Sequence, residues 1–222
     1  MDVRFMSKTL STKYATDYKN KLYVKKEKYP GLLIMFSKNE KVNDEVRGVL
    51  VYGGNDWFFI SVPQYIALKS TKSLKRIGLL LESPHKDEYL NNQPISPANG
   101  VTGQKIESLI SQRMKSDWQI KLQSVPTITQ YDYEVVLINA VQYQTSCYKI
   151  LGEQWDHTNR NHVFRLLFNN FQLKTDLIGR LNSYKLDIIV NCITSNLKNE
   201  VSFINQLNGV QHIVDIHPSA WK

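Results

Sequence analysis

The chain has 222 residues, of which 42% are hydrophobic and 22% are charged. This size and composition suit one globular domain, or a core with an appendage, and they exclude an intrinsically disordered chain. The apolar runs are too short to span a bilayer, and residues 1–28 lack the apolar stretch of a signal peptide. We therefore expect a cytoplasmic protein without a membrane contact.

The charge balance indicates a polyanionic partner. Lys and Arg number 28 and Asp and Glu number 20, which gives a formal net charge of +8. Positive charge of this size favours nucleic acid as the partner, although it can also serve solubility alone. The predicted contact with DNA phosphates is a basic group near residue 70, made up of Lys69, Lys72, Lys75 and Arg76.

The first part of the chain predicts a small antiparallel β element. Three runs have strand character, at residues 31–36, 46–52 and 57–62. The sequence Gly53-Gly54-Asn55-Asp56 between the last two runs is a hairpin signal. We interpret residues 1–74 as an N-terminal β-rich extension ahead of the main body.

From residue 75 onward, strand patterns alternate with helical patterns. The strands are predicted at residues 77–81, 135–140, 186–192 and 212–216, and the helices at residues 103–114, 161–171, 175–184 and 196–207. This alternation predicts an α/β domain over residues 75–222, a three-layer α/β/α fold with a central four-stranded parallel sheet.

Three of these strands end in polar residues. Glu82 follows the first strand, Asn139 ends the second, and His217 follows the last. The carboxyl ends of parallel strands are where α/β sheets present their chemistry. A carboxylate there can do acid–base work, an amide can read one edge of a base, and an imidazole can donate to a developing anion. Each also has a structural alternative: a solvated loop carboxylate, a cap of the next turn, and a structural histidine.

A fourth segment, residues 91–104, is rich in turn-forming residues and opens a helix. It is longer than most strand-to-helix connections, and its backbone amides could approach a phosphate. The alternative is an ordinary connection.

Sulfur and imidazole ligands for a metal are few. Cys147 and Cys192 are the only cysteines, too few for an iron–sulfur cluster, and we expect two reduced thiols rather than a disulfide. The five histidines show no metal-ligand spacing. We therefore expect no metal site.

Together these segments resemble the uracil-DNA glycosylase superfamily. Residues 81–85 (Leu-Glu-Ser-Pro-His) are similar to its Gly-Glu-Ala-Pro-Gly motif, and residues 102–110 to the helix start that follows it. Residues 138–141 resemble its Asn-Val-Val segment, Asn159-Arg160 stands in the place of its downstream Asn-Arg, and residues 217–219 match its His-Pro-Ser. The first motif departs from the pattern at its first and last positions, which leaves the excised base open.

The resemblance implies a DNA glycosylase that hydrolyses the N-glycosidic bond of uracil or a modified pyrimidine, such as a hypermodified viral base, flipped out of DNA. Glu82 and His217 would be catalytic, the first acting on water or the sugar cation and the second on the departing base. Asn139 would read the base edge. The other predicted substrate contacts are Ser83, Pro84, His85, Tyr89 and Ser219. Trp221 is the predicted wedge that fills the gap in the duplex; the alternative is a tryptophan folded back onto the core.

The same resemblance implies no cofactor, DNA as the partner, and a role in DNA repair or antiviral defence. We also expect a monomer. Two alternatives stay open. One is a DNA-binding module on the same fold without turnover, which the altered first motif favours. The other is an N-glycosidase acting on free nucleosides or nucleotides, against which the net charge of +8 and the position of Trp221 count.

Overall fold

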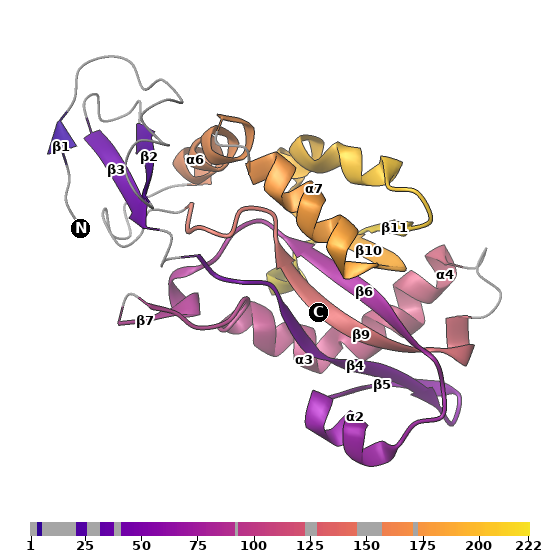
Figure 1. Cartoon of the computed structure of the whole chain (residues 1–222). Helices are drawn as coiled ribbons and strands as arrows, with labels where there is room; N and C mark the ends of the chain where they lie inside the picture. The colour runs from indigo at the N-terminus through magenta and orange to yellow at the C-terminus, as the bar shows by residue number, and fades with distance from the viewer. Residues whose placement is uncertain are drawn as a thin grey trace.

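The computed structural model describes residues 4–5, 21–25, 32–37, 41–91, 93–122, 128–145, 157–170 and 173–222. Its centre is a six-stranded, mostly parallel sheet with the strand order β11-β10-β6-β9-β4-β5 (Figure 1). The strands are β4 (Glu45–Gly53), β5 (Asp56–Ile60), β6 (Leu74–Leu81), β9 (Asp132–Asn139), β10 (Ile188–Asn191) and β11 (Gln211–Val214).

The four strands predicted after residue 74 are all present and lie next to one another. β6 pairs in parallel with β9 on one side and with β10 on the other, and β10 pairs in parallel with β11. Residues 77–81 of β6 and 135–139 of β9 are buried throughout, as a strand covered on both faces requires. Parallel pairing brings the carboxyl ends of all four strands to one edge.

The predicted size of the sheet is wrong, because the hairpin joins it. β4 pairs antiparallel with β9, and β5 pairs antiparallel with β4. The predicted turn itself is confirmed: Gly54 and Asn55 both have positive φ, as a two-residue hairpin loop requires. The residues of the turn determine the hairpin locally, but which strand of the sheet the hairpin pairs with depends on contacts between residues far apart in the sequence. The division at residue 74 stays a prediction, although the sheet runs across it.

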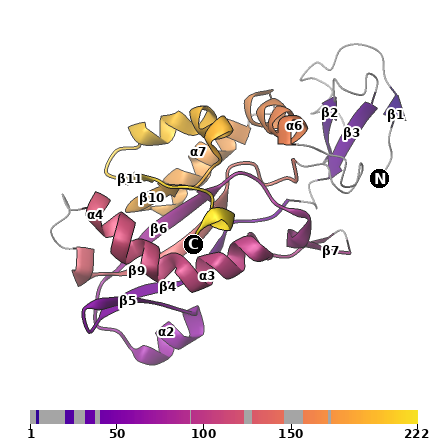
Figure 2. The same ribbon diagram turned by 180° about the vertical axis from the view of Figure 1, so that it is seen from behind.

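The strand predicted at residues 31–36 lies in a different sheet. It corresponds to β3 (Leu32–Ser37), which pairs antiparallel with β1 (Arg4–Phe5) and β2 (Lys21–Lys25). Figures 1 and 2 both place this three-stranded sheet beside α6. A two-stranded hairpin, β7 (Tyr89–Leu90) with β8 (Gln93–Pro94), lies in the loop after β6.

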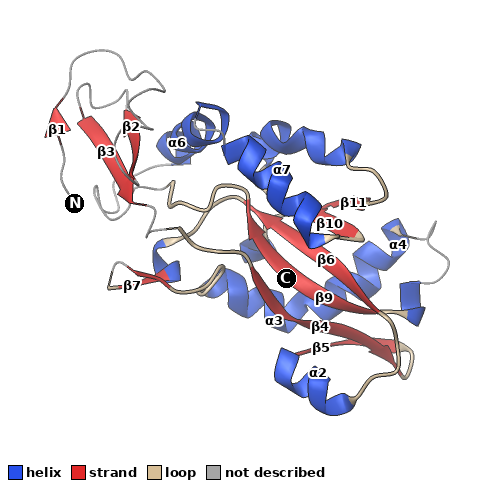
Figure 3. Cartoon of the chain, viewed as in Figure 1, coloured by secondary structure: helices blue, strands red, loops and turns tan. Residues whose placement is uncertain are grey.

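Helices cover both faces of the central sheet (Figure 3). One face carries α3 (Val101–Arg113), the π-helical turn η3 (Met114–Trp118) and α4 (Gln119–Lys121), and the other carries α6 (His157–Asn170), α7 (Leu173–Tyr184) and the 3₁₀ segment η6 (Ser195–Gln206). Shorter elements are α2 (Val62–Leu68), η2 (Lys86–Glu88), η4 (Ile128–Gln130) and η7 (Pro218–Ala220).

Each face of the sheet has its own core, as the two-residue period of a strand dictates. Leu79 and Leu81 of β6 pack with Ile106 and Ile110 of α3. Leu80, which points to the opposite face, belongs to the core with the aromatic residues of α6 and the leucines of α7. Because β6 packs against a core on each face, the backbone at its end, just before Glu82, is held rigidly.

Within the described part of the chain, no helix has both the length and the apolar character needed to cross a membrane. Cys192 is a buried free thiol, and burial raises its pKa. Cys147 lies outside the described residues, so the expected absence of a disulfide stays a prediction.

Candidate functional site

A cavity of about 680 Å³ lies at the edge where the four parallel strands end. A polar residue at the end of each strand lines the cavity: Glu82 after β6, Asn139 at the end of β9, Thr194 after β10 and His217 after β11. The first turn of α3 and Arg160 of α6 complete the wall. The volume falls within the range of small-molecule sites, roughly 300–1,000 Å³.

Most of the residues predicted to contact substrate also line this cavity. They are Ser83, Pro84, His85 and Ser219. The side chain of Ser83 shares a hydrogen bond of 2.7 Å with Thr145, and the exposed ring of His85 lies 3.2 Å from the Asp87 carboxylate. Tyr89 is half-buried in β7 and is not among the described residues that line the cavity.

Glu82 is not the solvated carboxylate of the structural alternative. The residue is 5% exposed, and its backbone carbonyl accepts from the Val141 N–H at 2.9 Å, which ties it to the end of β9. The carboxylate accepts a hydrogen bond from the Thr194 hydroxyl, and Arg160 Nη1 lies 3.3 Å from its Oε2. Charge-assisted partners of this kind fix the position of a carboxylate.

His217 is held as a neutral imidazole. Its Nδ1 accepts from the Ser219 N–H at 3.3 Å and lies 2.9 Å from Ser219 Oγ. Burial lowers the pKa of His217, and the positive Arg160 adds to this effect, although the Glu82 carboxylate opposes it. With Nδ1 acting as an acceptor we assign the proton to Nε2, which leaves one N–H donor for a molecule in the cavity.

Asn139 is 1% exposed and is held on both sides. Its Nδ2 donates to Glu88 Oε2 at 3.4 Å, while its backbone N–H donates to Asp44 Oδ1 at 3.2 Å. Its Oδ1 has no hydrogen-bond partner among the residues that the structure describes. The amide is therefore fixed through its nitrogen and keeps an unused acceptor.

A buried ionic cluster holds the backbone of Asn139 from behind. The Asp44 side chain, 1% exposed, pairs with Arg180 and accepts from the Tyr184 hydroxyl at 2.8 Å. Arg180 Nη2 in turn donates to the Asn139 carbonyl at 3.1 Å. Burial and the neighbouring Asp44 charge raise the pKa of Tyr184 to about 12, so this hydroxyl stays a donor at neutral pH.

The loop before α3 passes so close to the helix that the third residue of α3, Gly103, has no room for a side chain. A Cβ on Gly103 would lie 1.8 Å from the Ala98 carbonyl oxygen. Gly100, Val101 and Thr102 at the start of α3 line the cavity. The segment predicted to approach a substrate is thus at the site.

The prediction that Trp221 is exposed, as a wedge would have to be, is wrong. The residue is 1% exposed, its ring packs edge-on against Trp118 with the centroids 5.8 Å apart, and its Nε1 donates to the Ile216 carbonyl at 3.2 Å. η7 turns the chain onto α3, as Figure 2 shows, so the indole reaches the core. Burial of a large apolar surface is the physical reason.

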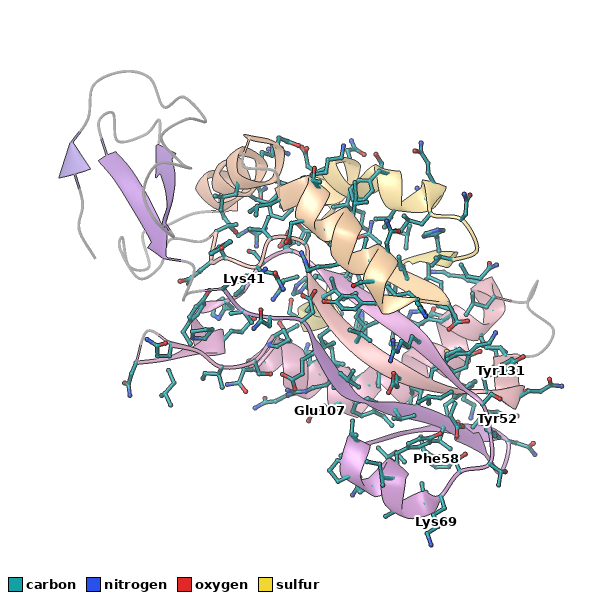
Figure 4. The ribbon with its side chains drawn as sticks, viewed as in Figure 1. Lys41, Tyr52, Phe58, Lys69, Glu107 and Tyr131 are labelled. Atoms are coloured by element: carbon teal, nitrogen blue, oxygen red, sulfur yellow. The ribbon has the colours of Figure 1, made fainter. Side chains whose placement is uncertain are left out.

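The predicted DNA-contacting basic group lies at the other end of β6. Lys72 and Lys75 contact the rings of Tyr52 and Tyr131, which Figure 4 labels, near the start of β6. Three of its members also have acidic partners: Lys72 with Asp132, Lys75 with Asp187 and Arg76 with Glu134. This group is therefore far along the strand from the cavity and largely neutralised.

Sequence reasoning missed the partners of the three strand-end residues. Glu88, Asp44 and Arg180 are separated from Asn139 by 51, 95 and 41 positions, so no local pattern links them. Arg160 carried a signal, since it stands where the resembled superfamily has its Asn-Arg pair. Thr194 follows the predicted strand 186–192, and the strand-end argument could have found it.

No group of three or more His, Cys, Asp and Glu side chains in the described ranges is arranged to hold a metal ion. Comparisons of the chain with protein-family models, curated proteins and solved structures found no match.

Proposed function

We propose that the protein is a DNA glycosylase that hydrolyses the N-glycosidic bond of uracil or a modified pyrimidine. One observation carries the proposal: a carboxylate, an amide and a neutral imidazole, from Glu82, Asn139 and His217, line one cavity at the ends of three parallel strands. A flipped nucleotide brings a sugar and a base edge to such a site, and each needs a different polar partner.

Each group suits one part of the reaction. As the base leaves, negative charge grows on its carbonyl oxygen, and the Nε2–H of His217 can donate to it. One such donor is worth roughly 10²–10³ in rate in enzymes that stabilise an oxyanion. The Glu82 carboxylate, held by Arg160 and Thr194, can stabilise the positively charged sugar or orient the attacking water. No step in this scheme needs a cofactor.

Oligonucleotides that contain one uracil or one modified cytosine test the proposal. Alkali cleaves the strand wherever a base has been excised. We expect cleavage by the wild type, and a rate at least about tenfold lower in Glu82→Gln and in His217→Ala with DNA binding largely kept, because both groups act on charge present only in the transition state. Wild-type rates in both variants would assign these side chains a structural role. Binding without cleavage on every substrate would favour a DNA-binding module.

The burial of Trp221 favours a second candidate, an N-glycosidase acting on free nucleosides or nucleotides. A small-molecule enzyme needs no wedge, and the indole is not available as one. Deoxyuridine and its 5′-phosphate, incubated beside the oligonucleotide, separate the two. Release of uracil from the free compounds alone would favour this second function.

A further inference from the structure

His85 and Asp87 form a side-chain pair in the wall of the cavity. Both residues line it, with side chains that are 61% and 45% exposed, and His85 Nδ1 lies 3.2 Å from Asp87 Oδ2. An imidazole that is oriented by a carboxylate is a recurring form of the general base in enzymes. The cavity therefore holds a candidate general base besides the three strand-end groups on which the proposed function depends.

The backbone beneath this pair is held in place although the two side chains are exposed. The N–H of His85 donates to Glu88 Oε1 at 3.0 Å, and its carbonyl accepts from the Glu88 N–H at 3.1 Å. The carbonyl of Asp87 accepts from Asn99 Nδ2 at 3.1 Å. A Cβ on Gly100 would lie 2.7 Å from Asp87 Oδ2, so the Asp87 carboxylate packs directly against the start of α3. The loop after β6 thus fixes the origin of both side chains.

The position of Asp87 determines which ring nitrogen of His85 carries the proton. Asp87 meets Nδ1 with its carboxylate at 3.2 Å and with its backbone N–H at 3.5 Å. The carboxylate is the closer group and accepts hydrogen bonds only, so it requires a donor at Nδ1. We therefore assign the proton of the neutral ring to Nδ1. The lone pair is then on Nε2, the nitrogen that faces away from Asp87.

The strand-end groups of the cavity are less suited to take a proton from water. His217 has its proton on Nε2, as assigned above, so it is a donor there. The two oxygens of Glu82 meet the terminal nitrogens of Arg160 at 3.3 and 3.4 Å, and one of them also accepts from the Thr194 hydroxyl. No described residue forms a hydrogen bond with the Nε2 of His85, which leaves this acceptor for a water molecule.

We propose that His85 is the general base that activates the attacking water, with Asp87 as its positioning residue. In this step the water oxygen bonds to C1′ of the flipped nucleotide, and the C1′–N bond breaks with its electron pair going to the pyrimidine. The water gives a proton to His85 Nε2, which passes it to solvent, and the released pyrimidine anion takes a proton from solvent. The inference rests on the proposed function and leaves Glu82 the task of stabilising the positively charged sugar.

Removal of the imidazole, followed by its return from solution, tests this role. The substrate is the oligonucleotide that the wild type cleaves fastest, with uracil or with a modified cytosine. In His85→Ala the excision rate should fall at least about tenfold, since a positioned general base contributes about 10²–10⁴ in rate. Free imidazole should then raise the rate of this variant at least about threefold, because an exposed site admits it, and leave the wild-type rate unchanged.

Two further variants serve as comparisons. Asp87→Asn keeps the imidazole but not the carboxylate that orients it, so its rate should fall less than that of His85→Ala and should not respond to free imidazole. Glu107→Gln, an exposed change on α3 (Figure 4), should keep the wild-type rate with and without imidazole. Thermal unfolding verifies that each variant keeps the fold.

The pH dependence of excision gives a second readout. An imidazole accepts a proton only in its neutral form, so the wild-type rate should rise with pH between about 5.5 and 7.5, where imidazoles titrate. Among the described residues, the other charged or titratable groups of the wall are Glu82, Asp87, Glu88, Arg160 and His217. Burial raises the pKa of Glu88 to about 7, so this carboxyl titrates in the same range. In His85→Gln, which keeps Glu88, the rise should be lost.

The outcomes separate this inference from the proposed function. A wild type that excises nothing overturns the proposed function, and the role of His85 with it. A wild-type rate in His85→Ala, or a slow variant that imidazole does not rescue, overturns the role of His85 and leaves the glycosylase standing. A rise with pH that persists in His85→Gln also overturns it and moves the general base to another group of the wall, such as Glu88.

Discussion

The indole of Trp221 belongs to the core on the α3 face of the sheet. It contacts Trp118, and the Nε1–H groups of both rings have acceptors: the Ile216 carbonyl for Trp221 and the Asp215 carboxylate, at 2.7 Å, for Trp118. Arg113 pairs with the same carboxylate. Since Asp215 lies two residues before His217, this cluster also anchors the strand end that carries the imidazole.

Replacing Trp221 with alanine should therefore lower stability rather than duplex recognition. Removal of a fully buried tryptophan costs about 3–5 kcal/mol of unfolding free energy, which urea unfolding measures. Excision from single-stranded and double-stranded DNA should fall together. Trp221→Phe, which keeps most of the apolar surface, should lose less stability. A Trp221→Ala variant that is as stable as the wild type and excises more slowly from duplex DNA alone would support the role of Trp221 as a wedge.

Single residues also mark the limit of what the sequence could predict. Glu82, Asn139 and His217 were predictable because each stands at the end of a strand-like run of the sequence, and such a run is a local pattern. The burial of Trp221 was not, because the same His-Pro-Ser-Ala-Trp sequence fits an exposed or a buried indole. The choice depends on whether α3 offers a surface to pack against, and no local pattern reports that.

At the scale of elements, the turn after β9 depends on charges from two distant segments. Asp44, just before β4, accepts from the Asn139 N–H and, at 3.1 Å, from Gln142 Nε2. Arg180 of α7 pairs with Asp44 and donates to the Asn139 carbonyl. The sequence predicted β4 and α7 individually, but it placed β4 outside the main body because its pairing with β9 is long-range.

Asp44→Asn should therefore destabilise the protein strongly. Removing Asp44 takes away the buried one of the two carboxylates that pair with Arg180, and breaking a buried ion pair costs about 3–5 kcal/mol. Asp176 provides a matched control: it also pairs with Arg180, at 2.8 Å, but its side chain is 36% exposed. Asp176→Asn should cost no more than about 1 kcal/mol, as exposed ion pairs do. Urea unfolding of both variants measures the difference, and equal losses would contradict a dominant role for Asp44.

At the scale of the whole molecule, the basic residues that the sequence pointed to do not lie beside the cavity. The net charge is +8, yet three of the four members of the basic group near the start of β6 are paired with acids, and the group lies at the end of the strand opposite the cavity. Lysines nearer the site hold its backbone: Lys105 Nζ donates to the Ser219 carbonyl at 2.8 Å, and Lys198 Nζ to the Asp215 carbonyl at 2.9 Å. Under the proposed function, Lys105 is the better candidate for a phosphate contact, because it binds the carbonyl of Ser219, which lines the cavity, whereas Lys75 lies at the other end of β6.

The salt dependence of DNA binding tests this placement. Displaced counterions make the logarithm of the binding constant fall linearly with the logarithm of the salt concentration, by about 0.9 for each phosphate contact. We expect a steep fall for the wild type, a slope reduced by about one contact in Lys105→Gln, and an unchanged slope in Lys75→Gln, measured by fluorescence anisotropy with a labelled oligonucleotide. Thermal unfolding of both variants verifies that the fold is kept. A flat wild-type dependence would assign the charge to solubility, and a loss of slope in Lys75→Gln alone would return the phosphate contact to the start of β6.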